Sequence, residues 1–223
     1  GIIVIKTGLP SFIVTLATFF VLRGANLALT KEITGTVRVT NLQDADGYDS
    51  AFSLVATKFN IGDATFEISI LWWIAITVAA TWLLTRTRFG NWIFASGGDK
   101  NAARNAGVPV ARTKIILFMM TSLAAAFVGI MFVLRLQGMQ AGQGVGMEFF
   151  YIIAAAVGGT LLMGGAGSAI GASIGAAIMG MADIGIPYAL WDSDWRWTFI
   201  GVILLAAVLV NTFIQNRAKG AKR

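Results

Sequence analysis

The chain has 223 residues, of which 57% are hydrophobic and only 13% are charged, about half the charged fraction of an ordinary soluble domain. It contains no cysteine and no histidine, which excludes disulfides, thiolate chemistry, imidazole metal ligands and a histidine base. The net charge of +6 does not indicate a nucleic-acid partner, because ten of the seventeen Lys/Arg residues lie in residues 86–114 and 217–223 and no basic stripe alternates with aromatic residues.

Long apolar runs dominate the chain. Several runs of about 18 or more residues carry few or no charges, which is typical of membrane-spanning helices. We therefore predict an all-α, polytopic membrane helix bundle embedded in lipid. Residues 1–5 are apolar, with neither an initiator Met nor the charged leader of a signal peptide. We expect the natural protein to be longer at its N-terminus.

The first predicted span covers residues 10–29, and Pro10 suits the first turn of a helix. The span contains Thr15, Asn26 and, near its far end, Arg23. Two interpretations of Arg23 are open. Its guanidinium either extends to the membrane interface or faces a polar cavity, since ionisable groups inside spans tend to be functional.

Residues 30–67 are predicted to form an extracytoplasmic loop. Within this stretch six acids stand against three bases, and Gly, Asn, Asp and Thr are frequent, which is typical of an exposed loop with short strands or turns. The acids are irregularly spaced and lack the ligand pattern of a calcium loop. No metal site is therefore predicted.

The second predicted span, residues 68–85, carries tryptophans near both ends, as in the aromatic belts of membrane proteins. The predicted cytoplasmic loop follows at residues 86–114, with six Lys/Arg and one acid, Asp99. Such basic loops are retained in the cytoplasm. The third predicted span covers residues 115–134. A polar turn follows it, containing Gln137, Gln140 and Gln143.

Residues 149–182 contain no charge, and one helix of that length would measure about 50 Å, too long for a hydrocarbon core of about 30 Å. We predict two limbs, with a tight turn at residues 164–167. Glycines recur every four residues on the predicted return helix, which lets helix backbones approach closely in lipid; they are Gly167, Gly171 and Gly175. The GxGxxG-like pattern here is no nucleotide loop, because no strand precedes it.

Asp183 lies near the far end of this return helix. The aromatic, charged turn after it includes Trp195, and most residues of this turn are expected to anchor at the interface. The last predicted span covers residues 197–214, and residues 215–223 form a predicted cytoplasmic tail. Four spans or half-spans then separate the basic loop at residues 86–114 from the basic tail. An even number of crossings places both regions on the cytoplasmic side, as their charges require. The chain has about six in all.

Catalytic chemistry has no basis in this sequence. We find no nucleophile–base pair, phosphate-binding loop or metal cluster. No catalytic residue, metal site or bound cofactor is therefore predicted. The physical reasoning alone ends at a polytopic transporter or channel.

Three stretches carry a resemblance to a known family. They are TLATFFVLRG in the first span, FGNWIFASGGDKNAARNAGVPVARTK at residues 89–114, and AAAVGGTLLMGGAGSAIGASIGA at residues 154–176. In this order they resemble the permease subunits of bacterial monosaccharide ABC importers, the ribose/xylose/galactoside-type group. The resemblance covers nearly the whole chain. It implies a fold like the C-terminal part of a permease with around ten spans, forming a single permease domain over residues 1–223.

The resemblance also implies a mechanism and partners in the bacterial inner membrane. A periplasmic sugar-binding protein would deliver a pentose or hexose, and two permease copies would form the pathway. Separate ATPase subunits, which bind ATP and magnesium, would act through residues 90–114. The matching residues implied to couple to the ATPase are Gly97, Gly98, Asp99, Asn101, Ala102, Ala103, Gly107 and Val108.

Physical reasoning about the same loop agrees in part. Residues 99–107 can form a short helix, with Asp99 favourably placed near its N-terminus. The alternative is a plain loop that only obeys the positive-inside rule. That rule explains the charges but not the cluster of Gly, Ala and Asn.

The sugar path is predicted from polarity and position alone, because sugars need hydrogen-bonding groups beside aromatic faces. The candidates are Thr15, Asn26, Gln137, Gln140, Gln143, Glu148 and Trp195. Two other functions stay open at this point. A secondary transporter or channel would need ion-coupling acids in its spans, for which Asp183 is the lone candidate. A membrane scaffold would need only the glycine packing.

Overall fold

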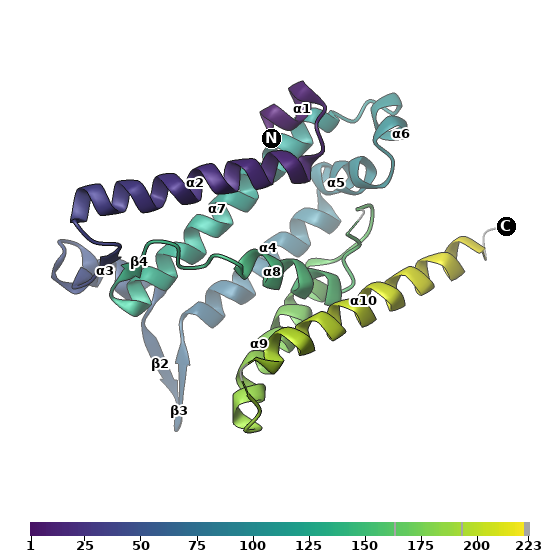
Figure 1. Cartoon of the computed structure of the whole chain (residues 1–223). Coiled ribbons are helices and arrows are strands. Elements are labelled where there is room, and N and C mark those ends of the chain that lie inside the picture. Colours follow the sequence, from purple (N-terminus) through teal and green to yellow (C-terminus); the bar gives the residue numbers. More distant parts are fainter. Residues whose placement is uncertain (163, 193, 221–223) are drawn as a thin grey trace. The chain divides into compact units, whose positions relative to one another are not determined.

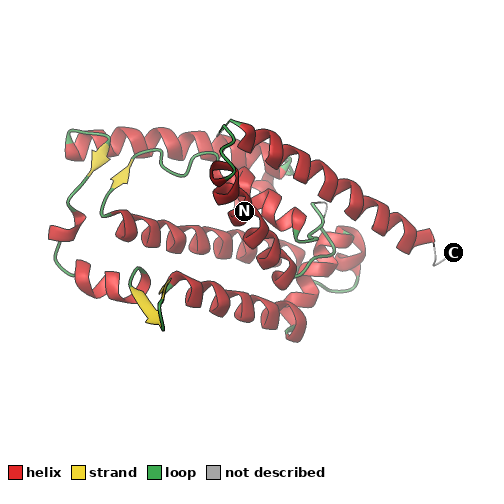
Figure 2. Ribbon diagram, turned by 90° about the horizontal axis from the view of Figure 1, so that it is seen from below, coloured by secondary structure: helices red, strands yellow, loops and turns green. Residues whose placement is uncertain are grey.

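The computed structural model describes residues 1–162, 164–192 and 194–220, with side chains as far as Phe213. Helices make up most of these residues, and the strands form two short ribbons (Figure 2). The chain divides into two compact units, one of Gly1–Ala75 with Ala111–Val145 and one of Ile76–Val110 with Gly146–Arg223. Each unit is described by itself below, and the single permease domain stays a prediction.

Five of the described helices are long and apolar enough to cross a membrane. They are α2 (Ser11–Thr34), α4 (Ser69–Arg86), α7 (Val110–Leu136), α9 (Ala169–Tyr188) and α10 (Trp195–Gly220). A shorter apolar helix, α8 (Met147–Val157), precedes α9 (Figure 1). The predicted polytopic helix bundle with about six spans or half-spans is therefore confirmed.

The helix boundaries differ from the predicted spans in one informative way. α7 begins at Val110 instead of residue 115, so the end of the predicted cytoplasmic loop is helical. Hydropathy marks only the part of a helix that lies in lipid, whereas backbone hydrogen bonds continue the helix beyond it. The predicted tail behaves similarly, because α10 extends to Gly220. Its last residues, 221–223, lie outside the described residues.

In the first unit, the loop after α2 is tied to the end of α7. Strand β1 (Arg38–Val39) pairs antiparallel with β4 (Met139–Gln140). The Tyr48 hydroxyl donates to the Leu134 carbonyl at 2.9 Å, and Arg135 forms an ion pair with Glu67 at 2.7 Å. These contacts hold the C-terminal end of α2 and the C-terminal end of α7 on the same side of the unit.

The predicted extracytoplasmic loop contains more regular structure than short strands or turns. It includes a short helix that the sequence did not predict, because an eight-residue helix has too few turns for a clear apolar period. Its elements are η1 (Leu42–Asp44), α3 (Tyr48–Val55), β2 (Lys58–Ile61) and β3 (Ala64–Glu67), with β2 and β3 forming an antiparallel hairpin. The chain opens with a further short helix, α1 (Ile2–Thr7).

The second unit has a core formed by α8, α9 and α10. Its buried residues are Ile153, Ala154, Met179 and Ile200, and Met179 is completely buried. The Asn211 side chain of α10 donates to the Ala156 carbonyl of α8 at 3.0 Å. In lipid, van der Waals packing and such interhelical hydrogen bonds hold helices together.

Glycines bring α8 and α9 into backbone contact. A Cβ atom on Gly175 would lie 2.7 Å from the Gly158 nitrogen, and one on Gly171 would overlap the Gly158 carbonyl. Gly167 does not share this helix, contrary to the predicted stripe, because α9 begins at Ala169 after the cap residue Ser168. A Cβ on Gly167 would instead meet the Thr160 side chain at 3.0 Å.

Candidate functional site

The predicted cytoplasmic loop folds into two short helices, α5 (Arg88–Gly98) and α6 (Lys100–Asn105). The corner between α4 and α5 is tight. The Thr87 hydroxyl oxygen accepts from the Gly90 nitrogen at 3.1 Å, and a Cβ on Gly90 would lie 2.5 Å from the Leu83 carbonyl oxygen. Only glycine fits this corner, so α5 leaves α4 in a fixed direction.

Both ends of α6 are capped, and the predicted short helix is present. Asp99 accepts hydrogen bonds at Oδ1 from the nitrogens of Asn101 and Ala102, at 2.8 and 3.0 Å. This satisfies donors that a helix start leaves open. At the other end Gly107 has φ +80°, and its nitrogen and that of Val108 donate to carbonyls of the last helical turn. This is a Schellman arrangement, which favours glycine.

Burial divides the predicted coupling residues into two groups. Ala103 is only 5% exposed and faces the protein, while Asp99 and Gly107 shape the helix ends. Asn101 and Ala102 are exposed. The sequence prediction omitted three neighbours that are also exposed, namely Lys100, Arg104 and Asn105. Projecting residues 100–105 onto a helix with Ala103 on the buried face would have placed these three residues on the exposed side.

Two glycine pairs from distant parts of the chain lie in backbone contact beside this loop. A Cβ on Gly97 would lie 2.8 Å from the Gly165 nitrogen, and a Cβ on Gly164 would lie 2.9 Å from the Gly97 carbonyl oxygen. The turn between α8 and α9, described at residues 158–162 and 164–168, therefore rests on the end of α5 and lies on the same side of the unit. Apart from the two Gly-Gly pairs themselves, nothing in the sequence indicates this pairing.

The residues predicted for a sugar path are spread over both units. Thr15, Asn26 and the three glutamines belong to the first, and Trp195 belongs to the second. Gln143 and Gln140 are brought together, since the Gln143 side chain accepts from the Gln140 nitrogen at 3.2 Å. The Thr15 hydroxyl instead donates to its own helix, at the Ser11 carbonyl. Their role in a sugar path stays a prediction.

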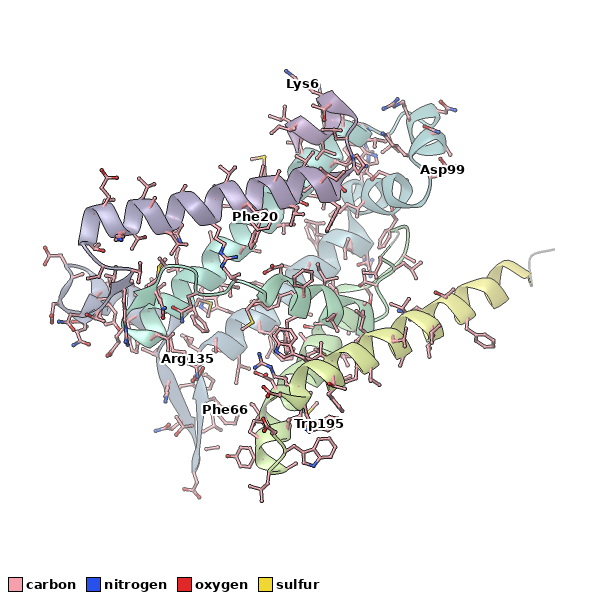
Figure 3. The ribbon with its side chains drawn as sticks, viewed as in Figure 1. Lys6, Phe20, Phe66, Asp99, Arg135 and Trp195 are labelled. Carbon is pink, nitrogen blue, oxygen red and sulfur yellow. The ribbon has the colours of Figure 1, made fainter. Side chains whose placement is uncertain are left out.

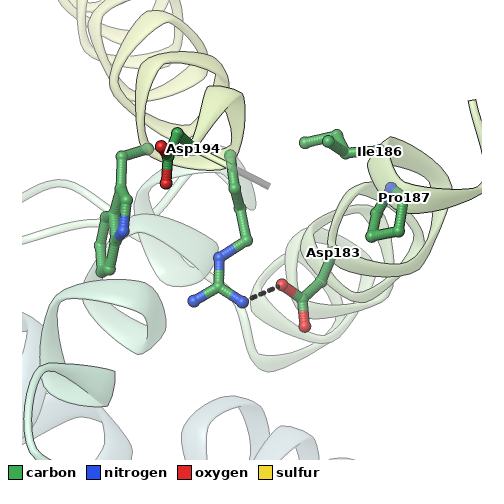
Figure 4. Close-up of a pocket in the computed structure, with 6 residues that line it drawn as sticks. Asp183, Ile186, Pro187 and Asp194 are labelled. Atoms are coloured by element: carbon green, nitrogen blue, oxygen red, sulfur yellow. Dashed lines mark hydrogen bonds and ion pairs between the residues drawn. The ribbon is translucent and has the colours of Figure 1, made fainter. Parts of the chain in front are cut away.

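The C-terminal end of α9, far from the glycine contacts, is held by charged and aromatic side chains. There Arg196 donates to Asp183 at 2.8 Å (Figure 4), and its guanidinium carbon lies 5.4 Å from the centre of the Trp197 ring. A cavity of about 300 Å³ is lined by Asp183, Ile186, Pro187, Asp194, Arg196 and Trp197. Figure 3 shows Asp99 and Trp195 at opposite ends of this unit. Asp183 is thus paired with a cation, which the sequence did not indicate.

Comparison with known proteins places the chain in a family. A family model described as "Branched-chain amino acid transport system / permease component" matches residues 1–208. The ribose import permease protein RbsC of Escherichia coli (strain K12) is 34% identical over 212 residues, which are 95% of this chain and 63% of that protein. The fructose import permease protein FrcC of Rhizobium meliloti is 29% identical, covering 98% of this chain and 59% of its own.

A third relative, the galactose/methyl galactoside import permease protein MglC of Salmonella typhimurium, is 31% identical over 98% of this chain and 63% of its own. No solved structure matches the chain. The chain spans about three fifths of the length of these curated relatives. The resemblance to sugar-importer permeases and the location as a multi-pass inner-membrane protein are confirmed. The chain belongs to the family of branched-chain amino acid transport system permease components.

Proposed function

We propose that this chain is part of the membrane-spanning permease subunit of an ATP-driven importer that carries a monosaccharide, a pentose or hexose, across the inner membrane. The observation that carries the proposal is the similarity, along nearly the whole chain, to permeases named for the import of ribose, fructose and galactosides. The five apolar helices support it. The subunit would move the sugar without catalysing a reaction.

The partners follow from this assignment. A separate ATPase subunit binds ATP and magnesium, a periplasmic protein delivers the sugar, and a second permease copy completes the pathway. The alternative of a secondary transporter would use Asp183 as its ion-coupling acid. The ion pair of Asp183 with Arg196 at 2.8 Å argues against that role, because a paired carboxylate already has its counter-charge.

The surface proposed to meet the ATPase is the exposed side of α6, which we name the α6 surface. It consists of Lys100, Asn101, Ala102, Arg104 and Asn105. The buried Ala103 seats α6 on the protein, and both helix ends are capped without help from a partner. The surface therefore combines small and amide side chains with two cations, which suits a partner with polar and acidic groups around a groove.

A cysteine cross-linking experiment tests this proposal in the natural, full-length protein. The 223 residues contain no cysteine, so once any cysteine elsewhere in the full-length protein is replaced by serine, Ala102→Cys gives a single defined attachment point. In membranes that contain the ATPase subunit, we expect Ala102→Cys to cross-link to it, and uptake of labelled ribose, fructose or galactose to require ATP.

The matched control is Asp63→Cys, at an exposed position between β2 and β3 on the predicted extracytoplasmic side. We expect no ATPase cross-link there, and labelling of intact cells by a membrane-impermeant maleimide. An Ala102→Cys protein that reacts with the external maleimide and never with an ATPase, together with uptake of no sugar in the panel, would refute the proposal.

A further inference from the structure

At the contact between α5 and the α8–α9 turn, Gly97, Gly164 and Gly165 have no room for an added carbon atom, while a Cβ on Gly98 would make an ordinary contact at 3.8 Å. We name the residues Gly97, Gly98, Gly164 and Gly165 the glycine clasp. A Cβ on Gly165 would lie 2.9 Å from the Gly98 Cα, and one on Gly164 would lie 3.1 Å from the Gly97 Cα. Real Cβ atoms essentially never approach other atoms to less than 3.0 Å, so no side chain separates the two backbones at this contact.

The turn half of the clasp is held by its own backbone hydrogen bonds. Leu161 donates to the Ala166 carbonyl at 3.1 Å, and Gly164 donates to the Leu161 carbonyl at 2.9 Å. Gly164 and Gly165 have φ of +89° and +86°, which glycine adopts without strain. The Ser168 hydroxyl then accepts from the Gly171 nitrogen at 2.9 Å and caps α9. The turn is therefore continuous with the first turn of α9.

The loop half of the clasp is equally well defined. Ser96 is buried, and its hydroxyl donates to the Trp92 carbonyl at 2.6 Å. The Asp99 nitrogen donates to the Ala95 carbonyl at 3.2 Å, while the Asp99 side chain caps α6. One residue thus closes α5 and opens α6. The chain therefore passes directly from the α6 surface to Gly97 and Gly98 through this junction.

We infer that the glycine clasp transmits displacements of the α5–α6 loop to α9, and that Gly97 and Gly164 are positioning residues for this transmission. The inference rests on the proposed function, which supplies the ATPase that moves the loop. No side chain lies between the two backbones at the clasp, so an advance of the loop on the turn acts directly on the backbone of the turn. A flexible side chain between them would absorb such a displacement.

The packing of α9 determines where such a displacement goes. Glycines hold α9 against α8, and the hydroxyls of Thr77 on α4 and Ser173 on α9 lie 2.7 Å apart. The 20 residues of α9 extend about 30 Å, close to the thickness of a hydrocarbon core. Its last turns line the cavity that contains Asp183 and Arg196. Movement at the clasp is thereby carried to the opposite end of the unit.

Matched glycine substitutions test the clasp, using the full-length transporter assembled with its ATPase. Gly164→Ala and Gly159→Ala both place alanine at positive φ, +89° and +83°, but a Cβ on Gly159 meets nothing within 4 Å. The two variants therefore share the backbone strain and differ in the contact. Gly97→Ala adds a carbon from the other side, within helix α5.

We expect Gly164→Ala and Gly97→Ala to import about tenfold less sugar per ATP hydrolysed, a usual size for coupling between two sites. Gly159→Ala stays within about twofold of the unsubstituted protein, since its cost is confined to local backbone strain. Cross-linking from Ala102→Cys to the ATPase is unchanged in all three. A merely structural defect would lower assembly and leave the ratio of transport to hydrolysis unaltered.

Amide hydrogen exchange provides a readout that does not depend on transport. Gly164→Ala should speed exchange at residues 97–99, at the end of α5 and its cap, and Gly97→Ala should speed it at residues 161, 162, 164 and 165. Equal exchange in Gly164→Ala and Gly159→Ala would overturn the clasp. Altered exchange with an unchanged amount of sugar imported per ATP hydrolysed would overturn the role of the clasp in transmission. If the unsubstituted protein imports no sugar, the proposed function fails, while the exchange result still decides whether the clasp exists.

Discussion

The two ends of α9 are built by opposite means. At its start, glycines put backbone against backbone, and a Cβ on Gly97 or Gly164 would lie less than 3 Å from the facing chain. At its end, Asp183, Arg196 and Trp197 interact through long side chains that are partly exposed. Contacts between backbones are intolerant of substitution and stiff, whereas contacts between long side chains can rearrange. The first end suits the transmission inferred above, whereas the contacts at the second end can rearrange.

The largest expected effect comes from enlarging the glycine contacts of α9. Gly175→Val should destabilise the protein by about 3 kcal/mol or more, because an overpacked interface must move backbone to make room. The matched control is Gly180→Ala on the same helix, where a Cβ meets nothing within 4 Å. Its stability should be unchanged or rise by up to about 1 kcal/mol through helix propensity. Thermal unfolding in detergent measures both, and equal melting temperatures would contradict the packing described here.

An intermediate effect is expected at the cap of α6. Asp99→Ala removes the acceptor for the Asn101 and Ala102 nitrogens, which should cost about 1 kcal/mol of local helix stability. Hydrogen exchange at residues 101–105 should quicken, and cross-linking from the α6 surface to the ATPase should weaken. Lys100→Ala serves as the control for exchange, since Lys100 has no capping role. Slow exchange retained in Asp99→Ala would show that the cap is dispensable.

The smallest expected effect is at the opposite end of α9. Asp183→Asn breaks an ion pair whose side chains are 37% and 40% exposed, and pairs of that exposure contribute about 1 kcal/mol or less. The melting temperature should therefore change far less than in Gly175→Val. A loss of stability as large as that of Gly175→Val would remove the contrast between the two ends.

The sequence predicted the features that depend on local composition. Hydropathy located the spans, the length of the uncharged run required a turn before α9, and Asp99 marked the start of α6. The clasp could not be predicted, because it joins residues about 70 positions apart through atoms that every residue possesses. Gly167 shows the reverse error, since its spacing matched a helical stripe while the helix starts only after Ser168.

The site predictions likewise succeeded where local sequence was sufficient and failed where contacts between distant residues decide the outcome. Family resemblance selected residues 97–108 as a group, but burial separated the exposed Asn101 from the buried Ala103. The partner of Asp183 was missed because Arg196 lies on the next helix and no sequence period relates the two. The glutamines after α7 were chosen for polarity and predicted position, and their role in a sugar path stays a prediction.

The capping of α6 has a thermodynamic consequence for assembly. Because Asp99 and Gly107 satisfy the helix ends within the chain, the six residues are already folded before any partner arrives. Binding there incurs little loss of conformational entropy, so most of the interaction energy of the α6 surface appears as affinity. Loops that fold only on contact lose part of that energy to ordering. If the proposed function is right, a preorganised loop of this kind would release and recapture the ATPase without refolding.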